Sequence, residues 1–219
     1  MDQLRKRHNS YKRELIECVC KENYEILDVG CGFGGDLQKW NNCRVVIHAC
    51  EPDETALNEA KRRSKNMRID TIFFNGDIMK CPYKKYDVIC YNFSLQYIFS
   101  SKGLFFKTIN AIRDRLKPNG KLIGIIPDSE YIIARTPLKD DLGNYFLVAD
   151  ITGYFGDKVD VYLTDTPYYN NGHIPEPIAY KDLLVTHLKE LGLELELWEH
   201  LYGSQITEMY SKFIFVYSK

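Results

Sequence analysis

Three carboxylates follow apolar runs in the first third of the chain. Asp28 and Glu51 lie at the carboxyl ends of two such runs, and Asp77 follows a third. Ligands of parallel sheets bind at the carboxyl ends of the strands, so we expect these side chains to face a common ligand. Ionised carboxylates only accept hydrogen bonds. The ligand should therefore offer ammonium, hydroxyl or amine donors.

A glycine-dense turn separates Asp28 from a helix that begins near Asp36. Glycines from Gly30 to Gly35 allow a sharp bend and a close approach of the backbone to a ligand, and the helix start presents unpaired N–H groups there. The same spacing fits the dinucleotide fingerprint G-x-G-x-x-G, with the acid Glu51 roughly 20 residues further on. A turn that only lets strand and helix pack closely is the simplest alternative, but it leaves Asp28 and Glu51 without a role.

Asp28 decides between the candidate ligands. A carboxylate at this place would repel the pyrophosphate of a dinucleotide, which disfavours a nicotinamide-dependent dehydrogenase. S-adenosylmethionine carries no phosphate, and its ammonium group and ribose hydroxyls are donors to acidic residues. Glu51 is placed to accept both ribose hydroxyls, while Asp77 and the apolar Ile78 suit the amine and the ring of adenine. The sequence therefore predicts an S-adenosylmethionine site.

Composition limits the remaining possibilities. A chain of 219 residues is long enough for one large α/β domain with a full core. A formal net charge of -1 lacks the broad basic field of a protein that grips duplex nucleic acid, so any nucleic acid contact should be local. The 7 cysteines form no C-x-x-C pair, which favours reduced core thiols in an intracellular protein and no metal site. No apolar run approaches the roughly 20 residues that cross a bilayer.

Strands and helices alternate as far as Pro127, which is the doubly wound α/β pattern. Beyond this point short strands are mixed with loops, and no repeat or linker marks a second domain. The sequence therefore predicts a single domain over residues 1–219. The expected strands are 24–29, 44–51, 71–74, 86–92, 121–126, 145–149, 159–163, 194–198 and 213–217. The expected helices are 54–64, 102–116 and 178–191, with a turn at 117–120 and with 174–177 introducing the last helix.

Two further segments should border the cofactor. The basic segment 5–13 runs into a helix with Leu15, Ile16 and Val19 as its apolar stripe, and most of its charges should be solvated. Lys12 lies just ahead of the glycine loop and can reach back over the cofactor carboxylate. Aromatic residues at 93–99 follow the fourth strand, so they should border the methyl donor.

Several of these motifs together resemble the messenger RNA cap guanine-N7 methyltransferases. The resemblance covers nearly the whole chain, and it looks closest to the methyltransferase portion of the capping enzymes of large cytoplasmic DNA viruses. It implies a class I, Rossmann-like, S-adenosylmethionine-dependent methyltransferase with a mostly parallel seven-stranded sheet flanked by helices. The motifs are 9–12, the glycine loop through 34–40, 93–97, the 115–121 turn, Pro175-Glu176, Tyr210 and the closing segment 210–219.

The resemblance also implies roles for individual residues. Gln96 departs from the family, whose cellular members usually carry His there, so the guanine atom it would touch stays open. Val159 stands where the family tends to have an aromatic residue, which shifts the expected stacking to Phe93 and to the loop tyrosines Tyr168 and Tyr169. The implied cofactor residues are Lys12, Asp28, Gly30, Asp36, Glu51, Asp77, Ile78 and Phe93, and the implied cap residues are Phe93, Gln96, Tyr97, Glu176 and Tyr210.

The chemistry of guanine methylation suits these residue types. Nitrogen 7 has a free lone pair and no proton to lose, so no acid or base residue is expected and positioning should dominate. If Glu176 accepts from the guanine edge, its hydrogen bonds strengthen as the base becomes positive. Aromatic faces at Phe93 and Tyr97 would favour the same charge. Taken without the family, Glu176 is more simply a carboxylate in the first turn of a helix, and either ring is more simply a core aromatic.

Rival functions and the biological setting follow from the same residues. A small-molecule methyltransferase would share the cofactor half of the chain, and a catalytically silent cap-binding subunit would share the fold. The expected partner is the capped 5′ end of RNA, GpppN, with S-adenosylhomocysteine as the second product. The resemblance implies fusion or binding to triphosphatase and guanylyltransferase modules, and a cytoplasmic location, in the virion or at a viral cytoplasmic site if viral and in the nucleus if cellular.

Overall fold

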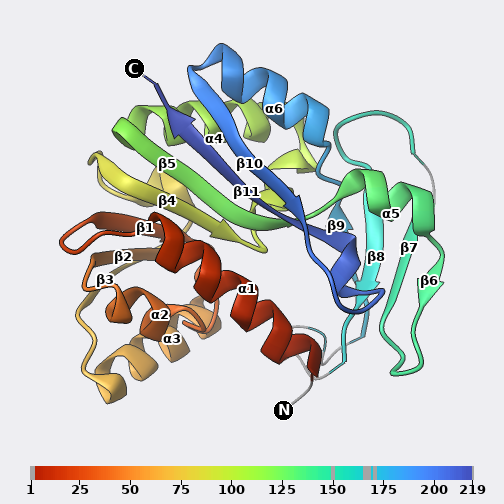
Figure 1. Cartoon of the computed structure of the whole chain (residues 1–219), viewed down its shortest axis with the longest axis horizontal. Coiled ribbons are helices and arrows are strands. Elements are labelled where there is room, and N and C mark those ends of the chain that lie inside the picture. Colours follow the sequence, from red (N-terminus) through yellow and green to blue (C-terminus); the bar gives the residue numbers. More distant parts are fainter. Residues whose placement is uncertain (1–2, 149–150, 165–168, 170–171, 219) are drawn as a thin grey trace.

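A seven-stranded sheet, mostly parallel, forms the centre of the computed structural model, which describes residues 3–148, 151–164, 169 and 172–218 (Figure 1). The strands β1 to β5, numbered along the sequence, run parallel to one another. β11 lies between β10 and β5 and is antiparallel to both. This arrangement confirms the predicted fold class. The strands, in sheet order, are β10 (Leu193–His200), β11 (Tyr210–Tyr217), β5 (Leu116–Pro127), β4 (Tyr86–Asn92), β1 (Glu25–Val29), β2 (Val46–Glu51) and β3 (Thr71–Asn75).

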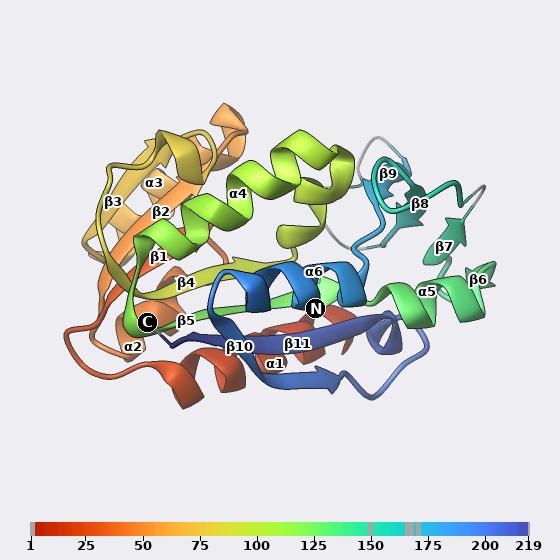
Figure 2. The same cartoon turned by 90° about the horizontal axis from the view of Figure 1, so that it is seen from above.

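Helices cover both faces of this sheet (Figure 2). One face is crossed by α1, which packs beside α2, and the other is covered by α4 and α6. Each face buries its own apolar cluster, one around Ile16 and Trp40 and the other around Phe105 and Leu188. The helices are α1 (Gln3–Val19), α2 (Leu37–Asn42), α3 (Glu54–Met67), α4 (Lys102–Arg115), α5 (Ser129–Arg135) and α6 (Lys181–Glu190), with short 3-10 turns η1 (Ile78–Lys80), η2 (Leu95–Ser100) and η4 (Thr207–Met209).

A second, antiparallel sheet lies beyond β5, where the sequence indicated only isolated short strands. Phe146 and Val161 from this sheet join the cluster that contains Ile16 and Trp40, so the main sheet and the small sheet share one core. Its strands, in order, are β6 (Leu138–Lys139), β7 (Tyr145–Val148), β8 (Lys158–Tyr162) and β9 (Ile174–Pro177).

Three local expectations were wrong. The basic segment at the start is helical, because the stripe of buried residues in α1 begins at Leu4. The expected turn at 117–120 is an irregularity inside β5, where Asn119 takes φ 62°. Glu176 lies on β9, not at a helix start; β9 is an edge strand, and edges tolerate the missing N–H of Pro175 and Pro177.

Other expectations concerned the state of the cysteines, metal sites and membrane-spanning segments. Cys31, Cys50 and Cys90 are buried free thiols, as predicted, whereas Cys18 is exposed on α1. Across the residues that the structure describes, no three His, Cys, Asp or Glu side chains gather as a metal site. No helix in the described ranges is long and apolar enough to span a bilayer.

Candidate methyltransferase site

One cavity of about 1100 Å³ opens at the carboxyl ends of the parallel strands, between the main sheet, the start of α1 and the small sheet. It is lined from α1, from the segments that follow β1, β2, β3 and β4, and from β9 and β11. The structure brings together all twelve residues singled out from the sequence as cofactor or cap contacts: Lys12, Asp28, Gly30, Asp36, Glu51, Asp77, Ile78, Phe93, Gln96, Tyr97, Glu176 and Tyr210.

The glycine loop requires glycine at two of its positions for steric reasons. Gly30 takes φ +73°, and a Cβ on it would lie 2.5 Å from the Cβ of Ser94. Gly34 takes φ +74°, and a Cβ there would lie 2.7 Å from Leu37 Cδ1. Because other residues strongly disfavour this backbone region, the loop can pass this close to its neighbours only with glycine.

Asp28 is a buried carboxylate that forms one wall of the cavity. It is 3% exposed and accepts a hydrogen bond of 3.1 Å from Trp40 Nε1. Burial and the neighbouring Asp36 carboxylate both raise the pKa of Asp28. Such a carboxylate gains a partner when a cation enters the cavity, as the ammonium group of S-adenosylmethionine would.

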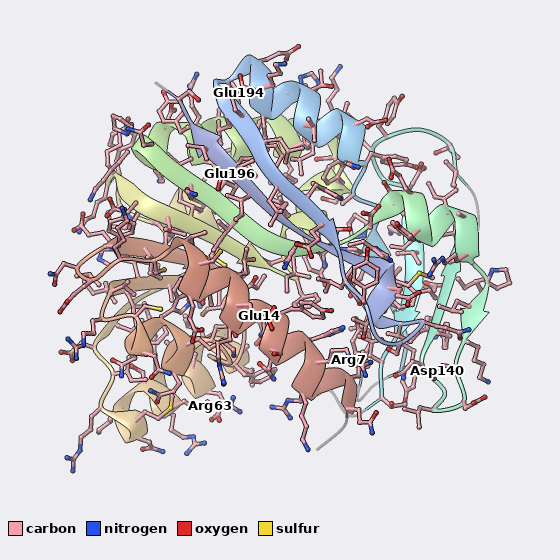
Figure 3. The ribbon with its side chains drawn as sticks, viewed as in Figure 1. Arg7, Glu14, Arg63, Asp140, Glu194 and Glu196 are labelled. Carbon is pink, nitrogen blue, oxygen red and sulfur yellow. The ribbon has the colours of Figure 1, made fainter. Side chains whose placement is uncertain are left out.

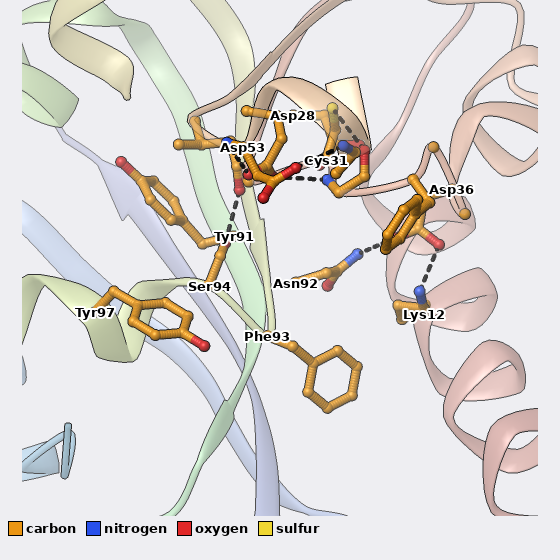
Figure 4. A pocket seen from close by; sticks show the side chains of 18 of the residues that line it. Lys12, Asp28, Cys31, Asp36, Asp53, Tyr91, Asn92, Phe93, Ser94 and Tyr97 are labelled. Carbon is orange, nitrogen blue, oxygen red and sulfur yellow. Dashed lines mark hydrogen bonds and ion pairs between the residues drawn. The ribbon is translucent and has the colours of Figure 1, made fainter. Parts of the chain in front are cut away.

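Asp36 is already paired within the protein. Its Oδ1 lies 2.8 Å from Lys12 Nζ and 2.7 Å from Lys39 Nζ, and its Oδ2 accepts from Asn92 Nδ2 at 3.1 Å; Figure 4 shows Lys12 and Asn92 pointing at it. Burial alone would raise the pKa of Asp36, but the two lysines outweigh burial and lower it. Lys12 therefore borders the cavity as one member of this charge cluster.

Glu51 and Asp77 are oriented by backbone N–H groups. Glu51 accepts from Gly32 N at 2.9 Å through Oε2 and from Asp53 N at 2.9 Å through Oε1. Asp77 Oδ1 accepts from Met79 N at 3.0 Å. Each carboxylate oxygen has a second lone pair, so both residues keep acceptor capacity for ribose hydroxyls and an adenine amine.

An unpartnered acceptor supports the fit of S-adenosylmethionine to this half of the cavity. Asn92 Oδ1 is buried, has no hydrogen-bond partner and belongs to a residue that lines the cavity. A buried acceptor without a donor costs free energy, and an entering ammonium group removes that cost. The buried apolar side chain of Ile78 lies in the same half, where an adenine ring needs a nonpolar wall.

The other half of the cavity contains Glu176. This carboxylate is 6% exposed, accepts from Tyr169 Oη at 2.6 Å through Oε1, and accepts from Gln96 Nε2 at 3.0 Å through Oε2. Burial raises the pKa of Glu176, and the hydrogen bonds from Tyr169 and Gln96 oppose that rise. Tyr97, 46% exposed on η2, adds an aromatic side chain to the same cavity.

Aromatic rings lie between the two halves. Phe93 takes φ 60°, a backbone conformation that costs energy for a bulky residue and is often found at functional sites. The buried Tyr210 lies edge-on to it, with ring centroids 5.1 Å apart. Val159 pairs with Glu176 in the small sheet but is not among the cavity-lining residues, and Tyr168 lies outside the described residues.

Sequence reasoning missed two residues of this cavity. His8 stacks on Phe93 at 5.2 Å, and burial, Lys12 and Arg7 lower its pKa to about 3, so the ring is neutral. The signal was present, because His8 precedes Lys12 by one helical turn and shares its face. Tyr169 appeared only as a loop tyrosine, and nothing in its local sequence indicates its hydrogen bond to Glu176.

The fold and the arrangement of the cavity are those of class I S-adenosylmethionine-dependent methyltransferases. The structure resembles an S-adenosylmethionine-dependent methyltransferase from Clostridium acetobutylicum, with a TM-score of 0.68, 15% identity and coverage of 100% of this chain and 93% of that one. It also resembles the glycopeptide N-methyltransferase MtfA complexed with S-adenosyl-L-methionine, with a TM-score of 0.66, 14% identity and coverage of 95% and 93%. At these identities the likeness concerns the fold alone.

The sequence identifies the family. Residues 1–200 match the mRNA (guanine-N(7))-methyltransferase domain, so the chain belongs to that family. An mRNA cap guanine-N(7) methyltransferase from Eremothecium gossypii is 26% identical over 245 residues, covering 96% of this chain and 56% of its own length. One from Schizosaccharomyces pombe is 29% identical over 146 residues, covering 60% and 41%. The chain thus spans about half the length of the curated relatives it matches.

Proposed function

We propose that this protein transfers the methyl group of S-adenosylmethionine to nitrogen 7 of the guanine that caps messenger RNA. One observation carries the proposal: a single cavity joins carboxylates suited to S-adenosylmethionine with a further buried carboxylate, Glu176, suited to a guanine edge. The family match supports the same reaction. Lys12, Asp28, Gly30, Asp36, Glu51, Asp77, Ile78 and Phe93 would hold the cofactor, and Phe93, Gln96, Tyr97, Glu176 and Tyr210 the cap guanosine.

Catalysis in this proposal rests on position. S-adenosylmethionine supplies an electrophilic methyl group on a sulfonium centre. Because nitrogen 7 carries no proton, no side chain has to act as a general base. Phe93 and Tyr97 hold the base at the boundary of the two halves, where reacting atoms have to lie roughly 3–3.5 Å apart and in line.

Glu176 would add electrostatic stabilisation. As the methyl group moves, positive charge develops on the guanine and its ring N–H becomes more acidic. Hydrogen bonds from that N–H and the exocyclic amine to the carboxylate therefore strengthen on the way to the transition state, which is differential binding. Burial amplifies this effect, since Glu176 is 6% exposed.

The wider setting belongs to the proposal as well. The substrate would be the capped 5′ end of RNA, GpppN. Triphosphatase and guanylyltransferase modules, fused or bound, would supply that end, and the site of action would be the cytoplasm or virion for a viral protein and the nucleus for a cellular one.

The direct test is methyl transfer from radiolabelled S-adenosylmethionine to GpppA by the purified chain, with the product position determined by mass spectrometry. We expect label on nitrogen 7. Glu176→Ala should lower kcat/KM for GpppA by about 100-fold or more while S-adenosylmethionine affinity changes little, and Asp28→Ala should abolish cofactor binding.

The outcomes separate the alternatives. Cofactor binding without transfer to GpppA, and without affinity for cap analogues, would replace the proposal by a small-molecule methyltransferase. Affinity for cap analogues without cofactor binding would indicate a silent cap-binding subunit. An equal loss of cofactor affinity in the Asp28 and Glu176 variants would remove Glu176 from the guanine.

A further inference from the structure

Glu176 accepts hydrogen bonds on both of its carboxylate oxygens, from a tyrosine 7 residues before it in the chain and from a glutamine 80 residues before it. Tyr169 precedes β9 and donates to Oε1 at 2.6 Å, and Gln96, on η2, donates to Oε2 at 3.0 Å. All three side chains are buried, with exposed fractions of 6% for Glu176, 8% for Tyr169 and 2% for Gln96. Both donor bonds to a buried carboxylate are charge-assisted and strong, so they fix its orientation.

The contacts of Gln96 determine which way its amide points. Its nitrogen faces two acceptors, Phe93 O at 3.0 Å and Glu176 Oε2 at 3.0 Å. A flipped amide would set its oxygen against both acceptors, so the network selects the present orientation. The amide oxygen of Gln96 is then left buried with no partner, in a residue that lines the cavity.

Counting lone pairs shows what the carboxylate can still bind. Each carboxylate oxygen has two acceptor sites, and Tyr169 and Gln96 each occupy one of them. One acceptor site is left on each oxygen, so the carboxylate can still accept from a pair of neighbouring donors. Guanine offers a matching pair of adjacent donors, its ring N1–H and its exocyclic amine. Hypoxanthine lacks the amine, and adenine carries an acceptor at N1.

We propose that Tyr169 and Gln96 are positioning residues that preset the Glu176 carboxylate for the paired donors of guanine, and that this clamp selects guanine over hypoxanthine. The inference rests on the proposed function and names the residues that set its specificity for the cap base. A carboxylate held in advance loses no rotamer entropy when the base binds. In this proposal Gln96 acts by holding the Glu176 carboxylate in place. The unpaired amide oxygen of Gln96 is a further acceptor for the exocyclic amine of guanine.

The clamp also has a pH signature. Among the described residues, the titratable groups beside Glu176 are Tyr169, Tyr210 on β11 and Tyr97 on η2, and the pKa values of Tyr169 and Tyr210 are raised by burial. The phenols of Tyr169 and Tyr210 are therefore neutral near pH 7. At saturating S-adenosylmethionine, where Asp28 already has its cationic partner, the ionisation of Glu176 governs the acid limb for GpppA. Burial raises the pKa of Glu176 and its two donors oppose that rise. Removing a donor should therefore shift the acid limb of kcat/KM to higher pH.

The test compares GpppA with IpppA, the analogue whose cap base lacks the amine, in the wild type, Tyr169→Phe and Gln96→Met. We expect the wild type to prefer GpppA by about tenfold to a hundredfold in kcat/KM. Each variant should lose about tenfold to a hundredfold on GpppA, should discriminate less between the two caps, and should show its acid limb at higher pH. S-adenosylmethionine affinity should stay within about threefold of the wild type, because neither side chain is assigned to the cofactor.

Tyr162→Phe is the matched control. Its ring lies edge-on to Tyr169 at 6.3 Å, in the same aromatic group, and it is not among the residues that line the cavity. This variant should keep the wild-type preference and pH profile.

Each other outcome has a separate meaning. A wild type that binds S-adenosylmethionine but does not methylate GpppA overturns the proposed function. An active wild type whose Tyr169→Phe and Gln96→Met variants keep both the cap preference and the acid limb overturns the clamp alone. Loss of cofactor affinity in both variants would show a structural role and also overturns the clamp.

Discussion

At the scale of single residues, Asp28 combines its proposed binding role with a cost in stability. Its carboxylate is buried next to that of Asp36. Among the described residues, Trp40 Nε1 donates a hydrogen bond to it. Burial and Asp36 raise its pKa. Because the folded-state pKa is raised, the cost to folding is fully present above that pKa, declines as the pH falls below it, and is gone below the pKa of the unfolded chain.

We therefore expect Asp28→Asn to stabilise the ligand-free protein at pH 8 by a few degrees in Tm, and to show a clearly smaller advantage at pH 5. The same variant should bind S-adenosylmethionine about 100-fold more weakly or worse, because the ammonium group loses its anionic partner. Calorimetric scans at the two pH values and binding titrations check both statements. A Tm difference that is the same at pH 5 and pH 8 would contradict the assigned cause.

At the scale of elements, α1 forms one wall of the cavity and also contacts a distant loop. It contributes His8 and Lys12 to the cavity, and it is fastened to the loop after β10 at two places. Tyr11 Oη donates to Tyr202 O at 3.0 Å and accepts from Tyr202 N at 3.1 Å. Arg7 packs over Gly203, where an added Cβ would lie 2.5 Å from Arg7 Nε, and Figure 3 shows Arg7 beside this loop.

Tyr11→Phe should loosen this fastening without altering a cavity-lining side chain. We expect faster amide hydrogen exchange in the first three turns of α1, and S-adenosylmethionine affinity lower by about threefold to tenfold because Lys12 is held less firmly. Ser10→Ala is the control, since its hydroxyl bonds only to the exposed Glu14 on the same helix. Unchanged exchange in the Tyr11 variant would show that packing alone holds α1.

Elements whose sequence pattern is local were predicted correctly, and those that depend on distant contacts were not. The strands β1 to β5 were predictable because each contains an apolar run, and the ends of β1 to β4 also carry or precede candidate site residues. In the small sheet β7 and β8 were predicted as short strands, but β6, with 2 residues, and β9, whose two prolines suggested a helix start, were not. Pairing of β8 with β9 and the contact of Gln96 with Glu176, 80 residues apart, depend on tertiary structure that no local pattern records.

The residues of the site divide in the same way. Asp28, Glu51 and Asp77 were found from their types and spacing alone. Glu176 and Tyr210 were found only through the family resemblance, since an isolated glutamate or tyrosine has many more common roles. The carboxylate partners of Lys12 and Gln96 were beyond reach, because side-chain direction is set by packing.

At the scale of the whole molecule, the shared core supports the proposal that residues 1–219 fold as one domain. Phe146 and Val161 of the small sheet pack in the same cluster as Ile16 and Trp40. We therefore expect one cooperative unfolding transition, observed alike by far-ultraviolet circular dichroism and by tryptophan fluorescence.

Ligand binding should raise the temperature of that transition. At 100 times its Kd, S-adenosylmethionine should add about 2.7 kcal/mol, which corresponds to roughly 5–10 °C for a chain of this size. Differential scanning calorimetry measures the shift, and Asp28→Ala, which lacks the proposed ammonium partner, should show little of it. An equal shift in that variant would place the ligand elsewhere.

The position of β11 has a consequence for protein synthesis. The strand enters the sheet between β10 and β5 and supplies Tyr210 to the cavity, while Leu4 and Lys12 enter it from the opposite end of the sequence. On the ribosome the parallel strands emerge first, but the gap that β11 fills closes only after residues 210–217 have left the exit tunnel. A nascent chain therefore acquires a complete binding cavity only after residues 210–217 have emerged, well after the strands that carry Asp28 and Glu51 have been synthesised.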